Sequence, residues 1–424
     1  MPSAVHVGID IGTTSAKICA IHAEKVIYDL KSHYEFPEPN NDNGLQDSKV
    51  IIKTVMDMLE KTKVLLQSHD LEISDIWTCG QMHGIVFWTQ KSIDNLVSSQ
   101  LYNWTYSNPE IQKFLKTLPK WSCGEVHPGF GLVTMAYLNS SDPEKLKNFD
   151  RCGTIMDLFL NVLCPSSEIF ISHHNAHSWG YCNSDATWQK EIIDFWPAWC
   201  QLPTVTQDNS RVIGNWQGAK CHVATGDLQA SVASLEVFDN TAYLILGTSA
   251  QLCCLIDSKC LLPTVPSTVV QLPYSRDKKL LAACSMNGGN ALESALKKFS
   301  SSNSSQKLSF LLDQLNDHPA PSDVQIAPIF LPERGISKEF TIRGTSSDTS
   351  DLQILEATHL GIIRNLFSMF PISLLKGLGI EKLGLIGSAQ CPRFRRHIEA
   401  VSGDNFKFLA PKSEFSTPVG ATKF

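Results

Sequence analysis

The beginning of the chain alternates between apolar runs and a short polar stretch. Residues 4–9 and 16–21 are mostly apolar, and a Gly-Thr-Thr stretch lies between them. Two β-prone runs joined by a turn of small residues predict a β-hairpin. A further β-prone run at residues 25–30 predicts a third strand directly after it.

The tip of this hairpin has the composition of a phosphate-binding loop. Gly12 permits a tight turn, so that backbone N–H groups and the hydroxyls of Thr13, Thr14 and Ser15 can surround a phosphate. Asp10 lies where a hard cation such as Mg²⁺ would meet that phosphate. An ordinary hairpin with a polar tip is the alternative that these residues alone leave open.

The rest of the chain alternates β-prone and helical stretches, which predicts the α/β fold class. Residues 50–66 repeat apolar side chains at helical spacing, with Ser48 as the predicted N-cap. A second helix is predicted to begin at Pro109 and to end at Leu118. Further predicted strands are residues 73–79, 85–88, 241–246, 251–256, 281–284 and 382–386, and residues 355–370 form a predicted helix that ends at Pro371.

The order of the opening repeats in the second half of the chain. Residues 223–227 run from apolar to acidic, and Gly247-Thr248-Ser249 joins two predicted strands as Gly12-Thr13-Thr14 does. A repeated phosphate hairpin predicts two related halves that face each other across a cleft.

Length and composition exclude several classes of protein. A chain of 424 residues, 43% hydrophobic and 18% charged, is too long for one core, so we expect two domains. A net charge of −6 gives no reason to expect nucleic acid as a partner. No long apolar stretch or leader pattern predicts a membrane span or a signal peptide. The 13 cysteines form no Cys-x-x-Cys pair and mostly lie in apolar runs, which predicts reduced thiols in a cytoplasmic protein.

Seven segments, in the same order, resemble motifs of the FGGY family of carbohydrate kinases. They are GIDIGTTSAK (8–17), CGQMHGIVFW (79–88), NAHSWGYCN (175–183), ATGDLQASV (224–232), LGTSAQL (246–252), SMNGGN (285–290) and a glycine turn at Gly387. The resemblance covers almost the whole chain. It implies a two-domain actin-like, ribonuclease-H-like ATPase fold with an interdomain cleft. Residues 1–222 would form the sugar-binding domain and residues 223–424 the nucleotide-binding domain, without the family's last helix.

The resemblance also implies a reaction and the residues that carry it. ATP, with Mg²⁺, would pass its γ-phosphate to a primary hydroxyl of a ketose, and sedoheptulose, giving the 7-phosphate, is the first expected substrate. Asp227 corresponds to the carboxylate that accepts the hydroxyl proton; a helix N-cap is its structural alternative. Asp10 would belong to the metal site. The sugar side would comprise Gln81, Met82, His83, Trp104 and Asn175, and the ATP site Gly12, Thr13, Thr14, Gly247, Thr248, Ser249, Gly288, Gly289 and Gly387.

Three positions depart from the family's sugar-side pattern. Tyr106 and Asn108 stand where an acidic and a basic residue are common, and His173 stands where an Asp is common. Neutral groups at these positions predict a relaxed preference for sedoheptulose over shorter ketoses. A kinase for another ketose such as xylulose, or a nucleotide- or sugar-binding protein with little turnover, are the alternative functions. The expected partner is a small-molecule ketose, without nucleic acid or membrane, and the oligomeric state stays open.

Two further groups of side chains have structural interpretations. His173, His174 and His177 are spaced like metal ligands, but no carboxylate or cysteine completes the set, so a metal site is not expected. Trp179 and Tyr181 are predicted to pack in the core rather than to stack on a sugar.

Overall fold

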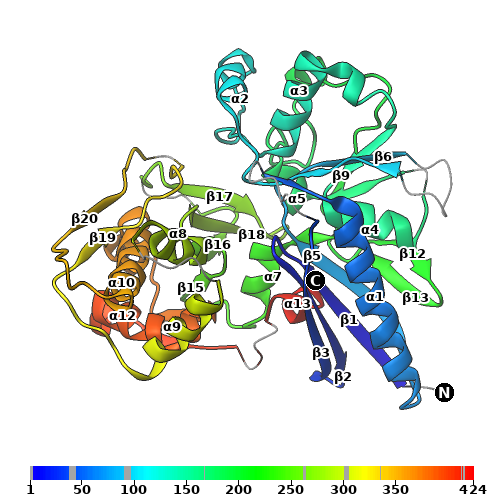
Figure 1. The fold of residues 1–424 in the computed structure, drawn as a ribbon. Helices are drawn as coiled ribbons and strands as arrows, with labels where there is room; N and C mark the ends of the chain where they lie inside the picture. Colours follow the sequence, from blue (N-terminus) through cyan, green and yellow to red (C-terminus); the bar gives the residue numbers. More distant parts are fainter. Residues whose placement is uncertain are drawn as a thin grey trace. The chain divides into compact units, whose positions relative to one another are not determined.

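The computed structural model describes residues 3–37, 44–89, 97–166, 168–260, 264–299, 305–334, 336–411, 413 and 416–424. The chain divides into two compact units, Met1–Ser234 with Phe415–Phe424 and Leu235–Glu414 (Figure 1). Residues 223–234 and the C-terminal segment, which the sequence analysis assigned to the nucleotide-binding half, thus lie in the first unit. The reason is that β14 (Thr225–Gly226) pairs with a strand of its sheet, and α13 (Ser416–Ala421) packs on α7 (Asp227–Ala233).

The first unit is built on a seven-stranded sheet with the order β12-β13-β5-β1-β2-β3, in which β14 also pairs with β5. The other strands of this sheet are β1 (Ser3–Ile11), β2 (Ser15–His22), β3 (Lys25–His33), β5 (Leu71–Gly80), β12 (Val212–Trp216) and β13 (Ala219–His222). Strands β1, β2 and β3 form an antiparallel meander, whereas β5 runs parallel to β1, and β13 and β14 run parallel to β5.

Smaller sheets and helices complete this unit. The small sheets pair β4 (Leu45–Gln46) with β8 (Leu101–Tyr102), β10 (Phe170–Ser172) with β11 (Thr204–Thr206), and β6 (Val86–Thr89) with both β7 (Val97–Ser98) and β9 (Arg151–Gly153). The helices are α1 (Ser48–Gln67), α2 (Pro109–Phe114), η1 (Leu115–Thr117), α3 (Gly131–Ser141), η2 (Pro143–Lys145), α4 (Ile155–Leu163), α5 (His173–Ser178), α6 (Lys190–Ile193), α7 and α13.

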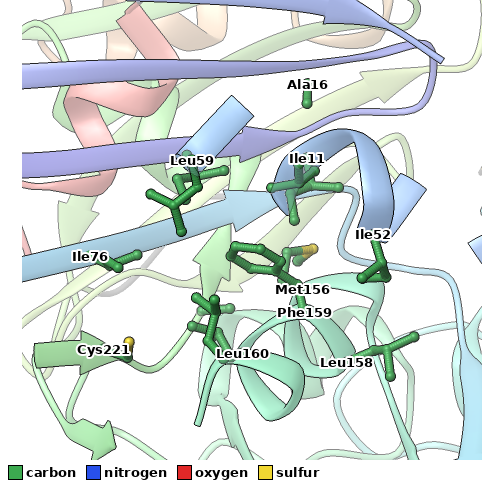
Figure 2. Close-up of a cluster of buried hydrophobic side chains, with 14 of the residues drawn as sticks. Ile11, Ala16, Ile52, Leu59, Ile76, Met156, Leu158, Phe159, Leu160 and Cys221 are labelled. Carbon is green, nitrogen blue, oxygen red and sulfur yellow. The ribbon is translucent and has the colours of Figure 1, made fainter. Parts of the chain in front are cut away.

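The alternation of side chains along β1 gives its two faces different roles. One face contributes Val5, Val7, Ile9 and Ile11 to the hydrophobic core with α1 and α4, part of which Figure 2 shows around Ile11. On the other face α13 approaches so closely that a Cβ at Gly8 would lie 2.0 Å from the carbonyl oxygen of Pro418. Asp10 follows Gly8 by two positions and therefore shares the face on which α13 packs.

The second unit is built on a six-stranded sheet with the order β17-β18-β16-β15-β21-β22. Its strands are β15 (Thr241–Leu246), β16 (Ala250–Asp257), β17 (Val269–Pro273), β18 (Lys278–Ser285), β21 (Lys382–Gly387) and β22 (Lys407–Leu409), and a separate pair comprises β19 (Gln325–Ala327) and β20 (Thr341–Arg343). Its helices are α8 (Gly289–Phe299), α9 (Ser305–Asp317), α10 (Asp351–Met369), α11 (Ile372–Gly377), η3 (Ser388–Gln390), α12 (Pro392–Ser402) and η4 (Gly403–Asn405).

Both units contain the same arrangement of strands, which confirms the repeat predicted from the two Gly-Thr turns. The order β5-β1-β2-β3 joins a parallel strand to an antiparallel meander, and β21-β15-β16-β18 does the same in the second unit. The first hairpin (β1–β2, turn residues 12–14) and the second hairpin (β15–β16, turn residues 247–249) therefore occupy corresponding places within their own units.

Local capping chemistry overturns one sequence prediction. The helix predicted at residues 50–66 is confirmed, but its predicted N-cap, Ser48, was wrong. Asp47 caps α1 instead, because its Oδ1 accepts hydrogen bonds from the N–H groups of Lys49 at 2.9 Å and Val50 at 3.3 Å. The Ser48 hydroxyl donates to the carbonyl oxygen of Ser99. In the same region of the chain, the helix predicted from Pro109 is α-helical only to Phe114 and continues as the 3₁₀ helix η1.

The structure bears on the predictions about the cysteines and about membrane-spanning helices. All 13 cysteines are free thiols and most are buried. None of the helices in the described ranges combines the length and the apolar character that crossing a membrane requires.

Candidate active site

The ends of neighbouring parallel strands bring several predicted residues of the first unit to one sheet edge. Cys79 of β5 lies between Asp10 of β1 and Thr225 of β14 in the strand register. Gln81 directly follows β5, and Asp227 directly follows β14. Because parallel strands end at the same edge of a sheet, Asp10, Gln81 and Asp227 share this edge.

Asp10 is buried, with 5% of its surface exposed, and Lys17 contacts it across the first hairpin. The two residues are opposite each other in the β1–β2 register, and Lys17 Nζ lies 3.1 Å from Asp10 Oδ2. The Asp10 carboxylate raises the pKa of Lys17, so the ammonium group stays charged. Lys17 is not among the site residues predicted from the sequence. A lysine in an otherwise apolar strand, opposite an acid, was the signal that could have identified it.

Asp227 is the first residue of α7, and the N-cap position belongs to Gly226, so the N-cap alternative for Asp227 was wrong. Its Oδ1 accepts a hydrogen bond from the Leu228 N–H at 2.7 Å. Burial raises the pKa of Asp227 to about 7, repulsion from Asp10 adds to this rise, and the Leu228 N–H and Lys17 oppose it. A carboxyl group with a pKa near neutrality is suited to act as a general base.

The turn of the first hairpin is held through its carbonyl groups. Gly12 N–H donates to the Ser15 carbonyl at 3.1 Å, which closes the turn. The carbonyl oxygens of Gly12, Thr13 and Thr14 accept hydrogen bonds from Tyr34 Oη at 3.2 Å, Gln46 Nε2 at 2.7 Å and Tyr34 N–H at 3.3 Å, respectively. Within the described chain, the N–H groups of Thr13 and Thr14 have no hydrogen-bond partner. Such donors suit an anion.

Gln81 and Trp104, two predicted sugar-side residues, contact the same turn. Gln81 Nε2 donates to the Gly12 carbonyl and to Gln46 Oε1, both at 3.3 Å. Trp104 Nε1 donates to the Thr13 hydroxyl at 3.0 Å. Gln46 is not among the predicted site residues, since nothing in its local sequence distinguishes it from any other polar residue before a helix.

Asn175 approaches the edge from α5. It is fully buried, and its Nδ2 donates to the carbonyl oxygen of Ala224, the residue before β14, at 3.1 Å. In the described structure, Asn175 Oδ1 and Gln81 Oε1 are buried acceptors without a hydrogen-bond donor. Buried acceptors of this kind are costly unless a ligand or a water supplies the missing donor.

Met82 and His83 connect the same region to α5. A Cβ at Gly226 would lie 2.7 Å from Met82 Cε, so the Met82 side chain packs against β14. The Ser178 hydroxyl donates to the Met82 carbonyl, and His83 Nδ1 donates to the Ser178 carbonyl, both at 2.8 Å. The partly exposed His83 ring stacks on Phe130 with 4.9 Å between ring centroids.

The three residues that depart from the family pattern, Tyr106, Asn108 and His173, each contact other protein groups of the first unit. Tyr106 packs edge-to-face on Tyr102, and Asn108 caps α2 by accepting from the Ile111 N–H at 2.8 Å. His173 Nε2 donates to the Asn183 carbonyl at 3.0 Å, and burial lowers the pKa of His173, so its ring is neutral near pH 7.

Two aromatic residues, Trp179 and Tyr181, come after α5, which contains His173, His174 and His177. Trp179 and Tyr181 are fully buried, as predicted. No group of three His, Cys, Asp or Glu side chains in the described ranges is arranged to hold a metal ion.

The predicted ATP residues of the second unit gather where β15 and β21 end. The second hairpin is closed by Gly247 N–H donating to the Ser249 carbonyl at 3.0 Å, and Gly289 N–H donates to the Gly247 carbonyl at 2.9 Å. Gly288 lies against Ser249, since a Cβ there would be 2.4 Å from its carbonyl carbon. Asn290 N–H donates to the Thr248 carbonyl at 3.2 Å, which ties the start of α8 to the hairpin.

Gly387 occupies the neighbouring strand end and requires glycine. It lies opposite Leu246 in the register, has a φ of 64°, and a Cβ there would be 2.5 Å from the Leu246 carbonyl oxygen. Glu333 is a buried carboxylate that is not among the predicted site residues. It fixes the end of β18 by accepting hydrogen bonds from Ser285 Oγ, the Met286 N–H and Asn287 Nδ2. No sequence pattern around Glu333 indicated this role.

Comparisons with known proteins show the family and the fold. Residues 5–232 match the N-terminal domain of the FGGY family of carbohydrate kinases. The chain is 29% identical to human sedoheptulokinase over 91% of this chain and 90% of that protein. Its fold is similar to those of a ligand-bound xylulose kinase from Lactobacillus acidophilus (TM-score 0.76, 18% identity, 99% of this chain and 88% of that chain) and of a Plasmodium falciparum glycerol kinase with ADP (TM-score 0.74, 17% identity, 99% and 88%).

These likenesses establish the fold as the two-domain actin-like ATPase fold and confirm the predicted α/β class. The family match covers more than half of the chain, and kinases of this family use ATP. The chain belongs to the FGGY family of carbohydrate kinases, phosphotransferases whose acceptor is a sugar hydroxyl.

Proposed function

We propose that this kinase phosphorylates a primary hydroxyl of a ketose, with sedoheptulose as the preferred substrate and sedoheptulose 7-phosphate as the product. The observation that carries the proposal is the arrangement of Asp227, Asp10 and Lys17 at one sheet edge, beside the turn of the first hairpin. Phosphoryl transfer depends on positioning and charge compensation more than on covalent chemistry, and this edge supplies groups for both.

In the proposed reaction Asp227 accepts the proton of the attacking hydroxyl. Its pKa near 7 leaves a useful fraction of the carboxylate ionised at neutral pH while keeping it basic enough to take a proton. Lys17 is charged and adjacent to the turn, so it can compensate negative charge on a phosphate. The N–H groups of Thr13 and Thr14 are the backbone donors of the first hairpin in this proposal.

Mg²⁺ belongs to the proposal as the metal that accompanies ATP. A protein site for Mg²⁺ in a kinase commonly uses one or two carboxylates, with phosphate oxygens and waters as the other ligands. Asp10 fits this requirement because it is a buried carboxylate beside the turn, and only its Oδ2 contacts Lys17 within the described structure. When bound there, the metal would neutralise phosphate charge.

The two units have separate roles in the proposal. The first unit holds the sugar through Gln81, Met82, His83, Trp104 and Asn175, together with the first hairpin and Asp227. The second unit holds the nucleotide through the second hairpin, Gly288, Gly289 and Gly387. The free thiols fit a reducing compartment, so we place the enzyme in the cytoplasm.

Sedoheptulose is favoured over other ketoses because human sedoheptulokinase is similar to this chain over nearly the full length of both proteins. Xylulose is the second candidate, since the fold is also that of a xylulose kinase. The neutral side chains of Tyr106, Asn108 and His173 lead us to expect measurable activity on shorter ketoses as well.

An ATP-consumption assay with sedoheptulose, xylulose and glycerol tests the proposal. We expect the highest kcat/KM with sedoheptulose. Asp227→Asn should lower kcat by about 10² to 10⁴-fold while nucleotide binding persists, because the amide cannot accept the proton. Asp351→Asn is the matched control, since Asp351 is also the first residue of a helix, α10.

The outcomes of this assay separate the substrate from the mechanism. If xylulose or glycerol is far the better substrate, the sedoheptulose assignment is wrong and the role of Asp227 still stands. If Asp227→Asn retains wild-type kcat, Asp227 is not the base.

A further inference from the structure

Two buried glutamine side chains connect the sugar-side residues to the turn of the first hairpin. Gln46 lies on β4, and its Nε2 donates to the Thr13 carbonyl at 2.7 Å. Gln81 follows β5, and its Nε2 donates to Gln46 Oε1 and to the Gly12 carbonyl. Gln46 and Gln81 are 8% and 4% exposed, so protein atoms rather than bulk water decide how these amides are oriented.

The partners of each amide fix which end is the donor. Backbone carbonyls accept only, so the Gln46 nitrogen must face Thr13 and its oxygen must face Gln81. The Gln81 nitrogen then faces two acceptors, and its oxygen is the end without a donor in the described structure. Asn175 repeats this arrangement, because its nitrogen faces the Ala224 carbonyl and its oxygen has no donor.

We propose that Gln46 is a positioning residue that holds Gln81 with its amide oxygen toward the sugar and connects sugar binding to the phosphate-binding turn. This inference rests on the proposed function. It also defines the ligand chemistry, because a site that presents acceptor oxygens from Gln81 and Asn175 takes hydroxyl donors of a neutral polyol. A carboxylate or phosphate of a substrate placed against these oxygens would be repelled.

The connection to the turn follows from how hydrogen bonds in a chain act on one another. A sugar hydroxyl that donates to Gln81 Oε1 polarises the amide and strengthens the bonds that its nitrogen donates. Those bonds lead to the Gly12 carbonyl and, through Gln46, to the Thr13 carbonyl. Trp104 adds a second link, since its Nε1 donates to the Thr13 hydroxyl. Sugar binding should therefore order the turn before ATP arrives.

Hydrogen–deuterium exchange of the turn, in the absence of ATP, tests this connection without turnover. Peptides covering residues 12–16 are followed in wild-type enzyme with and without saturating sedoheptulose, xylulose or glycerol. We expect a sugar to slow exchange in the wild type and to have a smaller effect in Gln46→Met, which keeps the length of the side chain and removes both hydrogen bonds of Gln46 but leaves the bond from Gln81 to the Gly12 carbonyl. Gln67→Met, at the exposed end of α1, is the matched control and should behave as wild type.

Kinetics distinguish positioning from a general loss of structure. Gln46→Glu keeps an acceptor for Gln81 and loses the donor to Thr13, so kcat should fall about 3- to 10-fold with little change in sugar KM. Gln46→Met loses both bonds, so sugar KM should also rise about 3- to 10-fold. A merely structural role would change the two variants alike, in proportion to their melting temperatures.

The outcomes separate this inference from the proposed function. A wild-type enzyme that phosphorylates no ketose contradicts the proposed function, whereas the exchange experiment still decides the role of Gln46. Equal protection of the turn in wild type and Gln46→Met, or no protection of the wild type by any of the three sugars, overturns the inference.

Discussion

At the scale of single residues, the two acids of the candidate site, Asp10 and Asp227, have different electrostatic surroundings. Lys17 contacts Asp10 directly at 3.1 Å, whereas it acts on Asp227 only as a more distant charge. Burial and the Asp10 charge therefore raise the pKa of Asp227 to about 7. Two carboxyl groups in different surroundings can take different chemical roles, and in the proposed reaction Asp10 holds the metal and Asp227 accepts the proton.

The raised pKa of Asp227 predicts a pH-dependent stability. The native pKa of about 7 exceeds the ordinary value of 3.8, so between these values the native state holds a proton that the unfolded chain releases. This group's contribution to the free energy of unfolding therefore falls as pH rises from about 4 to about 7. Asp227→Asn should raise the melting temperature at pH 8 and have little effect near pH 4, at roughly 2–4 °C per kcal/mol for a unit of this size.

Scanning calorimetry at both pH values measures this difference, with Asp351→Asn as the control. A melting-temperature gain that is the same at pH 4 and pH 8 would show that the Asp227 carboxyl has an ordinary pKa in the folded protein.

The residues that sequence reasoning missed are those whose partners are known only once the register is known. Asp10 and Asp227 lie in recognisable motifs, and the sequence analysis assigned both of them. Lys17 gains its meaning from the β1–β2 register, which places it opposite Asp10. Gln46 donates to a carbonyl 33 residues away, at Thr13, and no local pattern encodes that contact.

At the scale of elements, the hydrophobic pattern was a good guide wherever an element contributes a full face to a core. The predicted strand at residues 241–246 is β15 with the same bounds, and the helix predicted at residues 355–370 is the buried α10. Its start was predicted four residues late, because the Ser350–Gln353 capping box, not the apolar pattern, begins the helix. Short elements such as β14 and α13 have too few residues to show a period, so the sequence analysis could not define them.

The contact between α13 and α7 yields a prediction at this scale. A Cβ at Gly420 of α13 would lie 1.7 Å from the carbonyl oxygen of Ala230 in α7, the helix that begins with Asp227. Gly420→Ala must therefore separate the two helices, and overpacking of this kind typically costs about 1–3 kcal/mol. We expect a lower free energy of unfolding in urea and a lower kcat, because the start of α7 carries the proposed base.

Gly377→Ala is the matched control for this variant. Gly377 is also in a short helix, α11, and a Cβ there would meet no heavy atom within 4 Å. Alanine favours helix over glycine, so this variant should be as stable as wild type or slightly more stable. Equal stability of the Gly420→Ala variant and the control would mean that the α13–α7 contact relaxes without cost.

At the scale of the whole molecule, one strand arrangement occurs twice and carries different side chains at its edge. In the first unit the edge has buried carboxylates and amides, with Asp10, Asp227, Gln81 and Asn175. In the second unit the corresponding edge has glycines in close contact with backbone, at Gly288, Gly289 and Gly387. Carboxylates and amide acceptors suit hydroxyls and a proton, whereas the glycines of the second unit let its loops pack closely on one another at the edge that the proposal assigns to the nucleotide.

This division predicts that variants of the two units act on different ligands. Gly289→Ala places a Cβ 2.8 Å from the Gly247 carbonyl oxygen and disturbs the second hairpin, so ADP affinity should fall by about tenfold or more while sugar KM changes little. Asn175→Ala removes a buried acceptor in the first unit, so sugar KM should rise about 3- to 10-fold while ADP affinity, measured by calorimetry without sugar, stays at the wild-type value. The double variant should combine the two losses, because the free-energy effects of substitutions at sites without shared partners are additive. If Gly289→Ala weakens sugar and nucleotide to the same extent, the two units do not divide the ligands in this way, and each hairpin would have to be assigned to both substrates.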